Sequence, residues 1–405
     1  MTLPVLRRVL AAAVSLTAVA YVATVGLAQT PQAPPPAAPK AAPQAPRPPR
    51  SVLGATPPAI NVPAPGPATD QPYAPQPILQ GGIVVPVFPP GSPLLKADRV
   101  KEPEVYNMGA GGRINSIVNI HNPSVELHRA PANTNTGAAV IVVAGGGHNT
   151  LNVGGEGADF VPFFYHYGVT TIILRNRLRR DGYDPLVDAQ NDMLQAIKVV
   201  RAYAEDWGID PKKIGAMGFS AGAELTAAAA VKYGDYDKLH DVAGNPLAKI
   251  SSRPDFVALV YPGPTPFRGD TPFPIPDDAP PTFIICGGVG DAGHALWADE
   301  YFRAFLRARI PNLEMHIYGN GRHPGDPLPE GGNMPGGLNN RSGTPFGTWQ
   351  LRYIEWFRDI GFLEKPGVET KAARDVATRV ASPPRGRGQG PAGARGAAAP
   401  PVGRQ

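Results

Sequence analysis

Short apolar runs alternate with helix-like stretches between about residues 104 and 363. The runs are strand-like because β-branched or apolar residues dominate them, in a continuous stretch or, at 313–317, at alternate positions. They comprise residues 140–143, 170–174, 214–217, 256–260, 283–286 and 313–317. The clearest helical stretch is 186–206, with residues such as Leu194 and Ile197 at three- and four-residue steps. This alternation predicts an α/β fold with a mostly parallel, doubly wound sheet that has helices on both faces.

A nucleophile motif follows one of these predicted strands. Residues 214–217 lead directly into Gly218-Phe219-Ser220-Ala221-Gly222, and an Ala-rich helical stretch, residues 221–231, begins inside the motif. This is the strand, turn and helix setting of a Gly-x-Ser-x-Gly nucleophile elbow. Side chains at positions 218 and 222 are expected to strike the neighbouring strand and helix. Because ligands of parallel sheets bind beyond the carboxyl ends of the strands, Ser220 is the predicted nucleophile.

Three consecutive glycines after a predicted strand supply a candidate oxyanion hole. Gly145, Gly146 and Gly147 precede His148. Because glycine lets the backbone approach a substrate carbonyl, the N–H groups of Gly146 and Gly147, with that of Ala221, are the predicted donors. His148 is expected to face the substrate. A phosphate-binding loop would require a following Gly-Lys-Ser/Thr, which the sequence lacks.

The loop after the strand at 283–286 carries the predicted acid. Residues 287–294 read Gly-Gly-Val-Gly-Asp-Ala-Gly-His, and Asp291 is the one acid among them. The glycines also spell a dinucleotide-binding pattern. That fingerprint belongs on the first βα turn of a nucleotide-binding fold, whereas this one lies late in the sheet and after a nucleophile elbow. We therefore interpret Asp291 as a triad carboxylate.

The general base is predicted at His323, in the loop after the last strand. The chain order Ser220, Asp291, His323 is that of the α/β-hydrolase triad. His316 lies inside the strand and is expected to be a satisfied surface residue, whereas His294 is expected to open a helix. A metal site from Asp291, His294 and His323 is conceivable, but no close-spaced pair such as His-x-x-x-His supports it. No metal and no cofactor are expected.

Several short segments carry a family resemblance. They are Gly145–Gly147, Glu156-Gly157, Asp188-Ala189-Gln190, residues 207–211, residues 217–222, residues 253–256, Tyr261-Pro262-Gly263 and the loop of His323. Over about residues 117–363 the chain resembles secreted α/β hydrolases of the esterase/lipase superfamily, close to bacterial feruloyl and acetyl-xylan esterase-like proteins. The resemblance implies the same roles for Ser220, Asp291 and His323.

The expected function is that of a serine carboxylic-ester hydrolase that acts through an acyl-enzyme on short-chain or carbohydrate-linked esters, acetyl or feruloyl. One alternative is a serine peptidase of the prolyl-oligopeptidase type, whose gating propeller would need hundreds of residues upstream. Another is a non-catalytic binding protein, which would normally have lost a triad member. One departure from the family concerns the residues after His323. Relatives commonly continue with Gly-Phe-Gly, whereas Pro324-Gly325-Asp326 and an insertion to about Gly347 follow here and could reshape the leaving-group side.

Two apolar features are expected to belong to the core. Cys286, the single cysteine, closes an apolar strand and excludes a disulfide scaffold. A helix containing Trp349, Tyr353, Trp356 and Phe357 has its aromatic residues at helical spacing, which favours a core face over a sugar-binding platform.

The ends of the chain differ in composition from its middle. The 405 residues include 50 prolines and 47 glycines, which are dense near both ends. We expect a disordered Pro/Ala-rich linker at 29–95 that makes few core contacts, a catalytic domain at 96–366 and a disordered basic tail at 367–405.

The N-terminal residues read as an export signal. Residues 1–28 contain Arg7 and Arg8, an apolar stretch and a small-x-small site at 26–28. This pattern predicts a Sec-type signal peptide and a periplasmic or secreted protein, with a membrane anchor only if the signal stays uncleaved.

The net charge of +5 belongs to the two ends of the chain. Residues 1–50 hold five Lys/Arg and no acid, and residues 371–405 hold seven Lys/Arg and one acid, which leaves the middle at −6. Because the predicted domain is mildly acidic, no nucleic-acid partner is expected.

Overall fold

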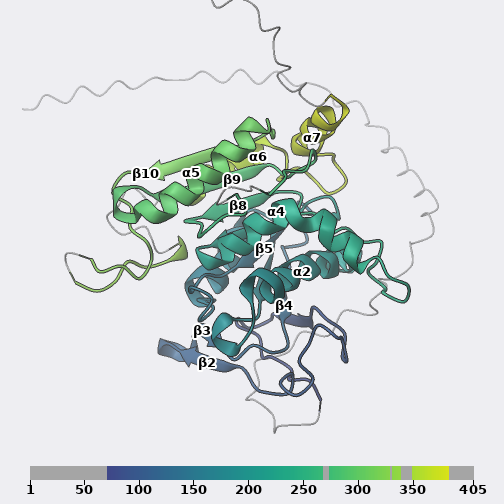
Figure 1. Cartoon of the computed structure of the whole chain (residues 1–405), viewed down its shortest axis with the longest axis vertical. Helices are drawn as coiled ribbons and strands as arrows, with labels where there is room; N and C mark the ends of the chain where they lie inside the picture. Colours follow the sequence, from purple (N-terminus) through teal and green to yellow (C-terminus); the bar gives the residue numbers. More distant parts are fainter. Residues whose placement is uncertain (1–70, 268–272, 329–330, 339–348, 383–405) are drawn as a thin grey trace, which may run out of the picture. The chain divides into compact units, whose positions relative to one another are not determined.

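The computed structural model describes residues 71–267, 273–328, 331–338 and 349–382. The predicted signal peptide and the predicted linker up to residue 70 lie outside these residues. Within them, an eight-stranded sheet has the order β1-β4-β6-β5-β7-β8-β9-β10. Figure 1 labels β4, β5, β8, β9 and β10 of this sheet. Its strands are β1 (Ile83–Pro86), β4 (Ser124–His128), β5 (Ala139–Val143), β6 (Thr170–Arg175), β7 (Ile214–Phe219), β8 (Val257–Val260), β9 (Thr282–Gly287) and β10 (Glu314–Tyr318). A separate two-stranded sheet pairs β2 (Val105–Met108) with β3 (Ile114–Val118).

The six strands predicted from the sequence are β5 to β10, and they form the parallel part of the sheet. β4 pairs antiparallel with both β1 and β6. A search for apolar runs misses β4, because Glu126 and His128 alternate with its apolar residues. Both polar side chains are nevertheless buried, and they are hydrogen-bonded to each other at 2.8 Å. The expected mostly parallel α/β architecture is confirmed.

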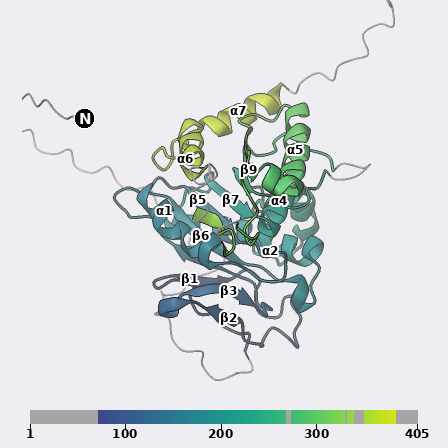
Figure 2. The ribbon, with the colours of Figure 1, turned by 90° about the vertical axis from the view of Figure 1, so that its left-hand side faces the viewer.

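The helices beside the sheet are α1 (Phe160–His166), α2 (Gln190–Ala202), α4 (Ala221–His240), α5 (Ala292–Arg307) and α6 (Trp349–Asp359). They cover both faces of the sheet, as Figure 2 shows with α1 and α6 to its left and α2, α4 and α5 to its right. Phe160 and Trp349 place their rings 5.1 and 6.3 Å from that of Phe219 on β7. On the opposite face, α2 and α4 pack against alternate residues of the same strands, such as Ile141 and Ala216.

The helix predicted at 186–206 is divided in the structure. A π-helical turn, Pro185–Ala189, leads into α2, and Tyr203 separates α2 from the short helix α3 (Ala204–Trp207). Asp184 caps the start, because its side chain accepts the N–H of Leu186 at 2.9 Å. Among the predicted core features, Cys286 and the aromatic residues of α6 are all buried, so both predictions are confirmed.

The N-terminal boundary of the domain differs from the prediction. β1 extends the sheet at the edge of β4, and Ile78 and Phe88 are buried. The buried carboxylate of Glu126 accepts the N–H groups of Ile78 and Leu79 at 2.7 and 3.0 Å. The predicted disordered linker is therefore wrong for residues 71–95, because β4 and Glu126 need the hydrogen-bond partners that this segment supplies.

The C-terminal boundary also differs. Residues 371–381 of the predicted disordered tail form α7 (Lys371–Ala381), with Ala372 and Val376 buried. The hydroxyl of Thr370 caps the helix by accepting the N–H of Ala373 at 3.0 Å. The prediction is wrong for this segment because α7 has an apolar stripe that packs on the domain, and residues 383–405 lie outside the described residues. In the part of the chain that the structure describes, no helix combines the length and apolarity needed to cross a bilayer.

Two deletions test the N-terminal boundary. We expect removal of residues 29–95 to cost about 5 kcal/mol or more, because burial of each large apolar side chain contributes about 1.5–3 kcal/mol and Ile78, Val85 and Phe88 lose theirs. Removal of residues 29–70 alone should leave the unfolding transition nearly in place, because that stretch is Pro/Ala-rich. Circular dichroism during heating compares the two, and equal transition temperatures would show that residues 71–95 add no stability.

Candidate active site

The elbow around Ser220 has the strained geometry that the motif predicts. Ser220 lies between β7 and α4 with φ 49° and ψ −117°, a conformation that non-glycine residues adopt at a cost of about 1–3 kcal/mol. A Cβ atom at Gly218 would lie 2.4 Å from the carbonyl oxygen of Gly222, inside α4. A Cβ atom at Gly222 would lie 2.1 Å from the carbonyl oxygen of Val143 on β5. Both glycines are therefore required by close backbone approach.

The structure brings the three predicted triad residues together from three strand ends. Ser220 follows β7, Asp291 follows β9 and His323 follows β10. Nε2 of His323 lies 3.1 Å from Oγ of Ser220, and Nδ1 of His323 lies 3.1 Å from Oδ2 of Asp291. Asp291 is buried, whereas the other two side chains are half-buried. This chain of contacts can pass a proton from the serine to the imidazole while the carboxylate orients the ring.

The glycines before Asp291 have a structural reason unrelated to nucleotides. Cβ atoms at Gly288 and Gly290 would lie 2.7 and 2.6 Å from the carbonyl oxygens of Gly319 and Gly321. The N–H of Gly288 donates to the carbonyl of Tyr318 at 2.8 Å. Because the acid loop and the histidine loop touch through their backbones, the dinucleotide-like spacing reflects this close packing.

The carboxylate of Asp291 contacts a second histidine, His294, in addition to the predicted partner His323. Burial raises the pKa of its carboxyl, but hydrogen bonds from His294 and His323 outweigh burial and leave the pKa below its usual value. Oδ1 lies 2.5 Å from Nδ1 of His294. The sequence predicted His294 at the start of a helix and weighed it only as part of an unsupported metal site, and its three-residue spacing from Asp291 was the signal for this contact.

The glycine loop passes directly beside the nucleophile. A Cβ atom at Gly145 would lie 3.0 Å from Cβ of Ser220. Gly146 and Gly147 have φ values of 130° and 61°, which favour glycine. The N–H of Gly145 donates to the carboxyl of Glu156 at 2.8 Å, which anchors the residue directly before Gly146 and Gly147. Two of the predicted oxyanion donors, Gly146 and Gly147, thus directly follow a residue whose backbone is held in place.

Glu156 and Tyr261 support the glycine loop through hydrogen bonds, and the sequence alone predicted no role for either residue. The hydroxyl of Tyr261 donates to Oε1 of Glu156 at 2.6 Å and accepts the N–H of Gly337 at 3.1 Å. Its ring meets that of His323 edge-on, with centroids 5.2 Å apart. Burial raises the pKa of Glu156, and the hydrogen bonds from Tyr261 and Gly145 offset burial only in part.

The raised pKa of Glu156 makes a prediction about stability. The pKa of Glu156 in the folded protein exceeds the unfolded value of about 4.3. The contribution of protonated Glu156 to the free energy of unfolding is therefore complete below the unfolded-state pKa. It is lost as the pH rises through the folded-state pKa. Glu156→Gln should therefore gain stability relative to the wild type between pH 4 and pH 8. Glu156→Ala removes the acceptor of Gly145 and should cost about 2–4 kcal/mol at pH 4, a cost that shrinks as the pH rises because the wild type loses the contribution of Glu156. Thermal unfolding across this pH range measures both, and a Gln variant that weakens with rising pH would refute the argument.

His148 does not have the surroundings expected of a substrate contact. Its side chain is buried, and Nε2 lies 3.0 Å from Oε2 of Glu224 on α4. Its carbonyl accepts the N–H of Arg179 at 2.9 Å. His148, with φ 59°, therefore ties the glycine loop to the helix that begins at the nucleophile.

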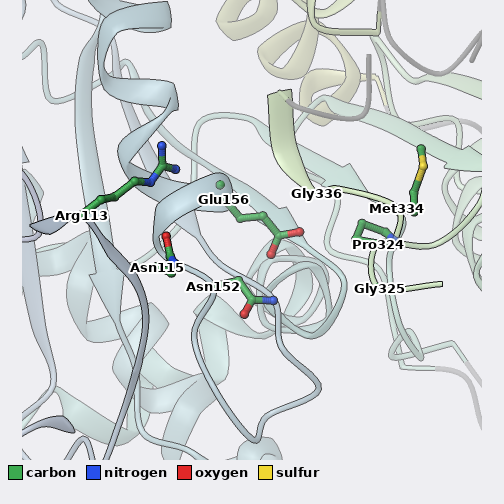
Figure 3. Close-up of a pocket in the computed structure, with 9 residues that line it drawn as sticks. Arg113, Asn115, Asn152, Glu156, Pro324, Gly325, Met334 and Gly336 are labelled. Carbon is green, nitrogen blue, oxygen red and sulfur yellow. The ribbon is translucent and has the colours of Figure 1, made fainter. Parts of the chain in front are cut away.

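A cavity of about 380 Å³ adjoins the site. Figure 3 shows Arg113, Asn115 and Asn152 on one side and Pro324, Gly325 and Met334 on the other, with Glu156 between them. Pro324 directly follows His323, so the insertion after the histidine supplies one wall. Arg113 is paired with Asp159 at 2.9 Å. The cavity thus offers polar groups on one wall and apolar groups on the other.

In the described residues, one cluster brings together side chains of the types that can bind a metal ion. The ligand atoms of Asp291, His294 and His323 lie within 4.8 Å of one another. Both histidines make hydrogen bonds to the carboxylate, and His323 also contacts Ser220. These contacts are those of a proton-sharing chain.

The comparisons with known proteins find a family model that matches the central segment and relatives that match about a third of the chain. The BD-FAE family model matches residues 125–259, which include the glycine loop and Ser220 but end before Asp291 and His323. An acetylxylan esterase of Xylanibacter ruminicola is 28% identical over 128 residues, 31% of this chain and 23% of that protein. Endo-1,4-beta-xylanase B of Butyrivibrio fibrisolvens is 33% identical over 125 residues, 30% of this chain and 19% of that protein. The chain thus spans about a fifth of the length of these curated relatives.

A solved structure supports the fold over a longer span. The acetyl ester-xyloside bifunctional hydrolase from Caldicellulosiruptor lactoaceticus is similar with a TM-score of 0.52 and 22% identity, over 69% of this chain and 97% of that chain. The fold and the resemblance predicted from the sequence are confirmed. This chain has an α/β-hydrolase fold, its residues 125–259 match the BD-FAE family model, and about a third of it is similar to an acetylxylan esterase.

Proposed function

We propose that this protein is a serine carboxylic-ester hydrolase. The observation that carries the proposal is the contact chain from Ser220 Oγ through His323 to Asp291, with both distances at 3.1 Å. The nucleophile in this chain sits on a strained elbow at the start of α4, beside a glycine loop that can bind an oxyanion.

The acylation step uses each of these groups. Oγ of Ser220 attacks the ester carbonyl and passes its proton to Nε2 of His323, while the carbonyl electron pair moves onto oxygen. The N–H groups of Gly146, Gly147 and Ala221 are the proposed donors to this oxyanion. When the tetrahedral intermediate collapses, the bond to the alcohol oxygen breaks and His323 returns its proton to the departing alkoxide.

Deacylation repeats the sequence with water. His323 takes a proton from water, the hydroxide attacks the acyl carbon, and collapse breaks the bond to Ser220 Oγ, which regains its proton. Asp291 holds the imidazole tautomer and stabilises the imidazolium that forms in both steps. No cofactor enters either step.

The cavity beside His323 favours a short acyl group or a carbohydrate-linked ester. Asn115, Asn152 and Arg113 offer hydrogen bonds to sugar hydroxyls, and Pro324 and Met334 offer apolar contact. The similarity to an acetylxylan esterase agrees with acetyl esters of a polysaccharide as substrates. We also propose export to the periplasm or medium, which rests on residues 1–28 alone.

A substrate screen with the purified full chain tests the function. Acetyl, butyryl and feruloyl esters, acetylated xylan and a peptidyl anilide are compared, and we expect turnover of the activated acetyl ester and release of acetate from the xylan. A fluorophosphonate probe followed by peptide mapping should label Ser220. Cleavage of the anilide with inert esters would indicate the peptidase alternative. The absence of both turnover and labelling would indicate a binding protein on a hydrolase fold.

A further inference from the structure

A second histidine lies against the acid of the candidate triad. Nδ1 of His294, in the first turn of α5, lies 2.5 Å from Oδ1 of Asp291, and Nδ1 of His323 lies 3.1 Å from Oδ2. The two imidazole rings are stacked, with centroids 3.8 Å apart and planes inclined by 8°. One carboxylate thus serves two parallel histidines, and His323 is the one that contacts Ser220.

We propose that His294 is a positioning residue that fixes the carboxylate of Asp291 and keeps His323 free of a proton in mildly acidic solution. The inference rests on the proposed esterase function and adds to it a residue that sets the working pH range. His294 acts through Asp291 and His323, and it has no contact with the reacting atoms in this scheme.

The orientation of Asp291 supports the first part of this role. Each carboxylate oxygen faces a different imidazole, so the bond to His294 leaves Oδ2 directed at His323. His294 is itself held in place, because its ring meets that of Trp297 edge-on at 5.2 Å and its side chain is 20% exposed. Loss of His294 would release Oδ1 and allow the carboxylate to rotate.

The charge balance supports the second part. The contact of Asp291 with His294 is shorter than its contact with His323, so the first proton taken up by the cluster is stabilised best at His294. A second proton would place two imidazolium rings 3.8 Å apart, which Coulomb repulsion opposes. These two observations carry the proposal: His294 makes the shorter contact with the shared carboxylate, and a charge on its ring opposes a second charge on the stacked ring of His323. Without His294, the first proton would go to His323.

Other ionisable groups surround the cluster. Those near it are Tyr261, Glu156, Asp326, Arg322 and Cys286. Burial raises the pKa of Cys286 to about 12 and that of Tyr261 well above its usual value, so neither loses a proton between pH 4 and pH 8. The raised pKa of Glu156 brings its titration towards the same range. The experiment is therefore repeated in a Glu156→Gln background.

The pH dependence of kcat/KM for an activated acetyl ester tests the inference. We expect His294→Gln to raise the midpoint of the acid limb by about one pH unit while the plateau falls less than about tenfold. His294→Phe keeps a flat ring without charge or N–H and should shift the midpoint in the same direction. His316→Gln is the matched control, because His316 also pairs with a carboxylate, Glu314, at 2.7 Å and should leave the midpoint unchanged. A lower plateau with an unmoved midpoint would overturn the inference.

A readout that needs no activity separates this inference from the proposed function. Titration of the imidazole resonances by NMR should show His294 taking up its proton before His323 in the wild type. In His294→Gln, His323 should become protonated at a higher pH than in the wild type. The reverse order of uptake overturns the inference even if neither variant folds. Absence of turnover and of Ser220 labelling, with the expected titration intact, would instead refute the esterase function alone.

Discussion

Ser220→Ala should lower kcat for an activated acetyl ester by about 10⁴–10⁶-fold while the protein stays folded. The variant removes the oxygen that lies 3.1 Å from Nε2 of His323 and leaves the rest of the contact chain in place. It removes no buried apolar contact and keeps a short side chain at the strained position, so the loss should appear in kcat and in covalent labelling. Steady-state kinetics and a fluorophosphonate probe measure these two losses.

Ser252→Ala is a suitable control for this experiment. Ser252 is also buried, but its hydroxyl donates to the backbone carbonyl of Tyr233 at 3.3 Å, on α4 and outside the catalytic constellation. We expect normal kcat and full labelling in this variant. If Ser220→Ala turned over substrate at the wild-type rate, Ser220 would not be the nucleophile.

Asp291→Asn should lower turnover by about 10⁴-fold and preserve folding. A carboxamide has one acceptor oxygen and presents N–H donors in place of the other, so it cannot accept from both His294 and His323. The wrong imidazole tautomer of His323 would then face Ser220, and the imidazolium formed during acylation would lose its counter-charge. The lowered pKa of Asp291 means that the carboxylate is ionised from mildly acidic to alkaline pH in the wild type. Its contribution to stability is lost as the pH falls through the folded-state pKa.

Asp299→Asn is the matched control for the acid. Asp299 lies eight residues later inside α5, where Oδ1 accepts a hydrogen bond from Nε of Arg303 at 2.8 Å. A surface pair of this kind contributes little, so the variant should lose less than about tenfold in turnover. Circular dichroism checks that both variants fold. A larger loss for Asp299→Asn than for Asp291→Asn would move the catalytic acid to position 299.

Local patterns in the sequence were enough to predict the parallel half of the sheet and the nucleophile elbow. Strands buried on both faces are mostly apolar, so β5 to β9 appear as short apolar or β-branched runs, whereas the edge strand β10 alternates apolar with polar residues. The elbow is visible because Gly218 and Gly222 have no alternative where backbone atoms approach within the distances found here. The chain order of Ser220, Asp291 and His323 also follows from these strand ends.

The tertiary structure alone decided the edges of the domain. β1 and α7 lie in stretches whose composition suggests disorder, and each is held by contacts with residues far away in the sequence. The pairing of β1 with β4 joins residues about forty apart, as in Ile83 opposite Leu127. The amino-acid composition of a short segment cannot predict such pairing, because the strand that stabilises the segment lies elsewhere in the sequence.

The supporting residues of the site were also decided by tertiary contacts. Glu156 reaches Tyr261, 105 residues later, and His148 reaches Glu224, 76 residues later. His294 became part of the site because α5 starts immediately after Asp291 and its first turn faces the loop of His323. A sequence motif records which residues must occupy a tight turn, since the steric constraint is local. It does not record which buried acid or second histidine completes the site, because those contacts exist only once separate strands are brought together in the sheet.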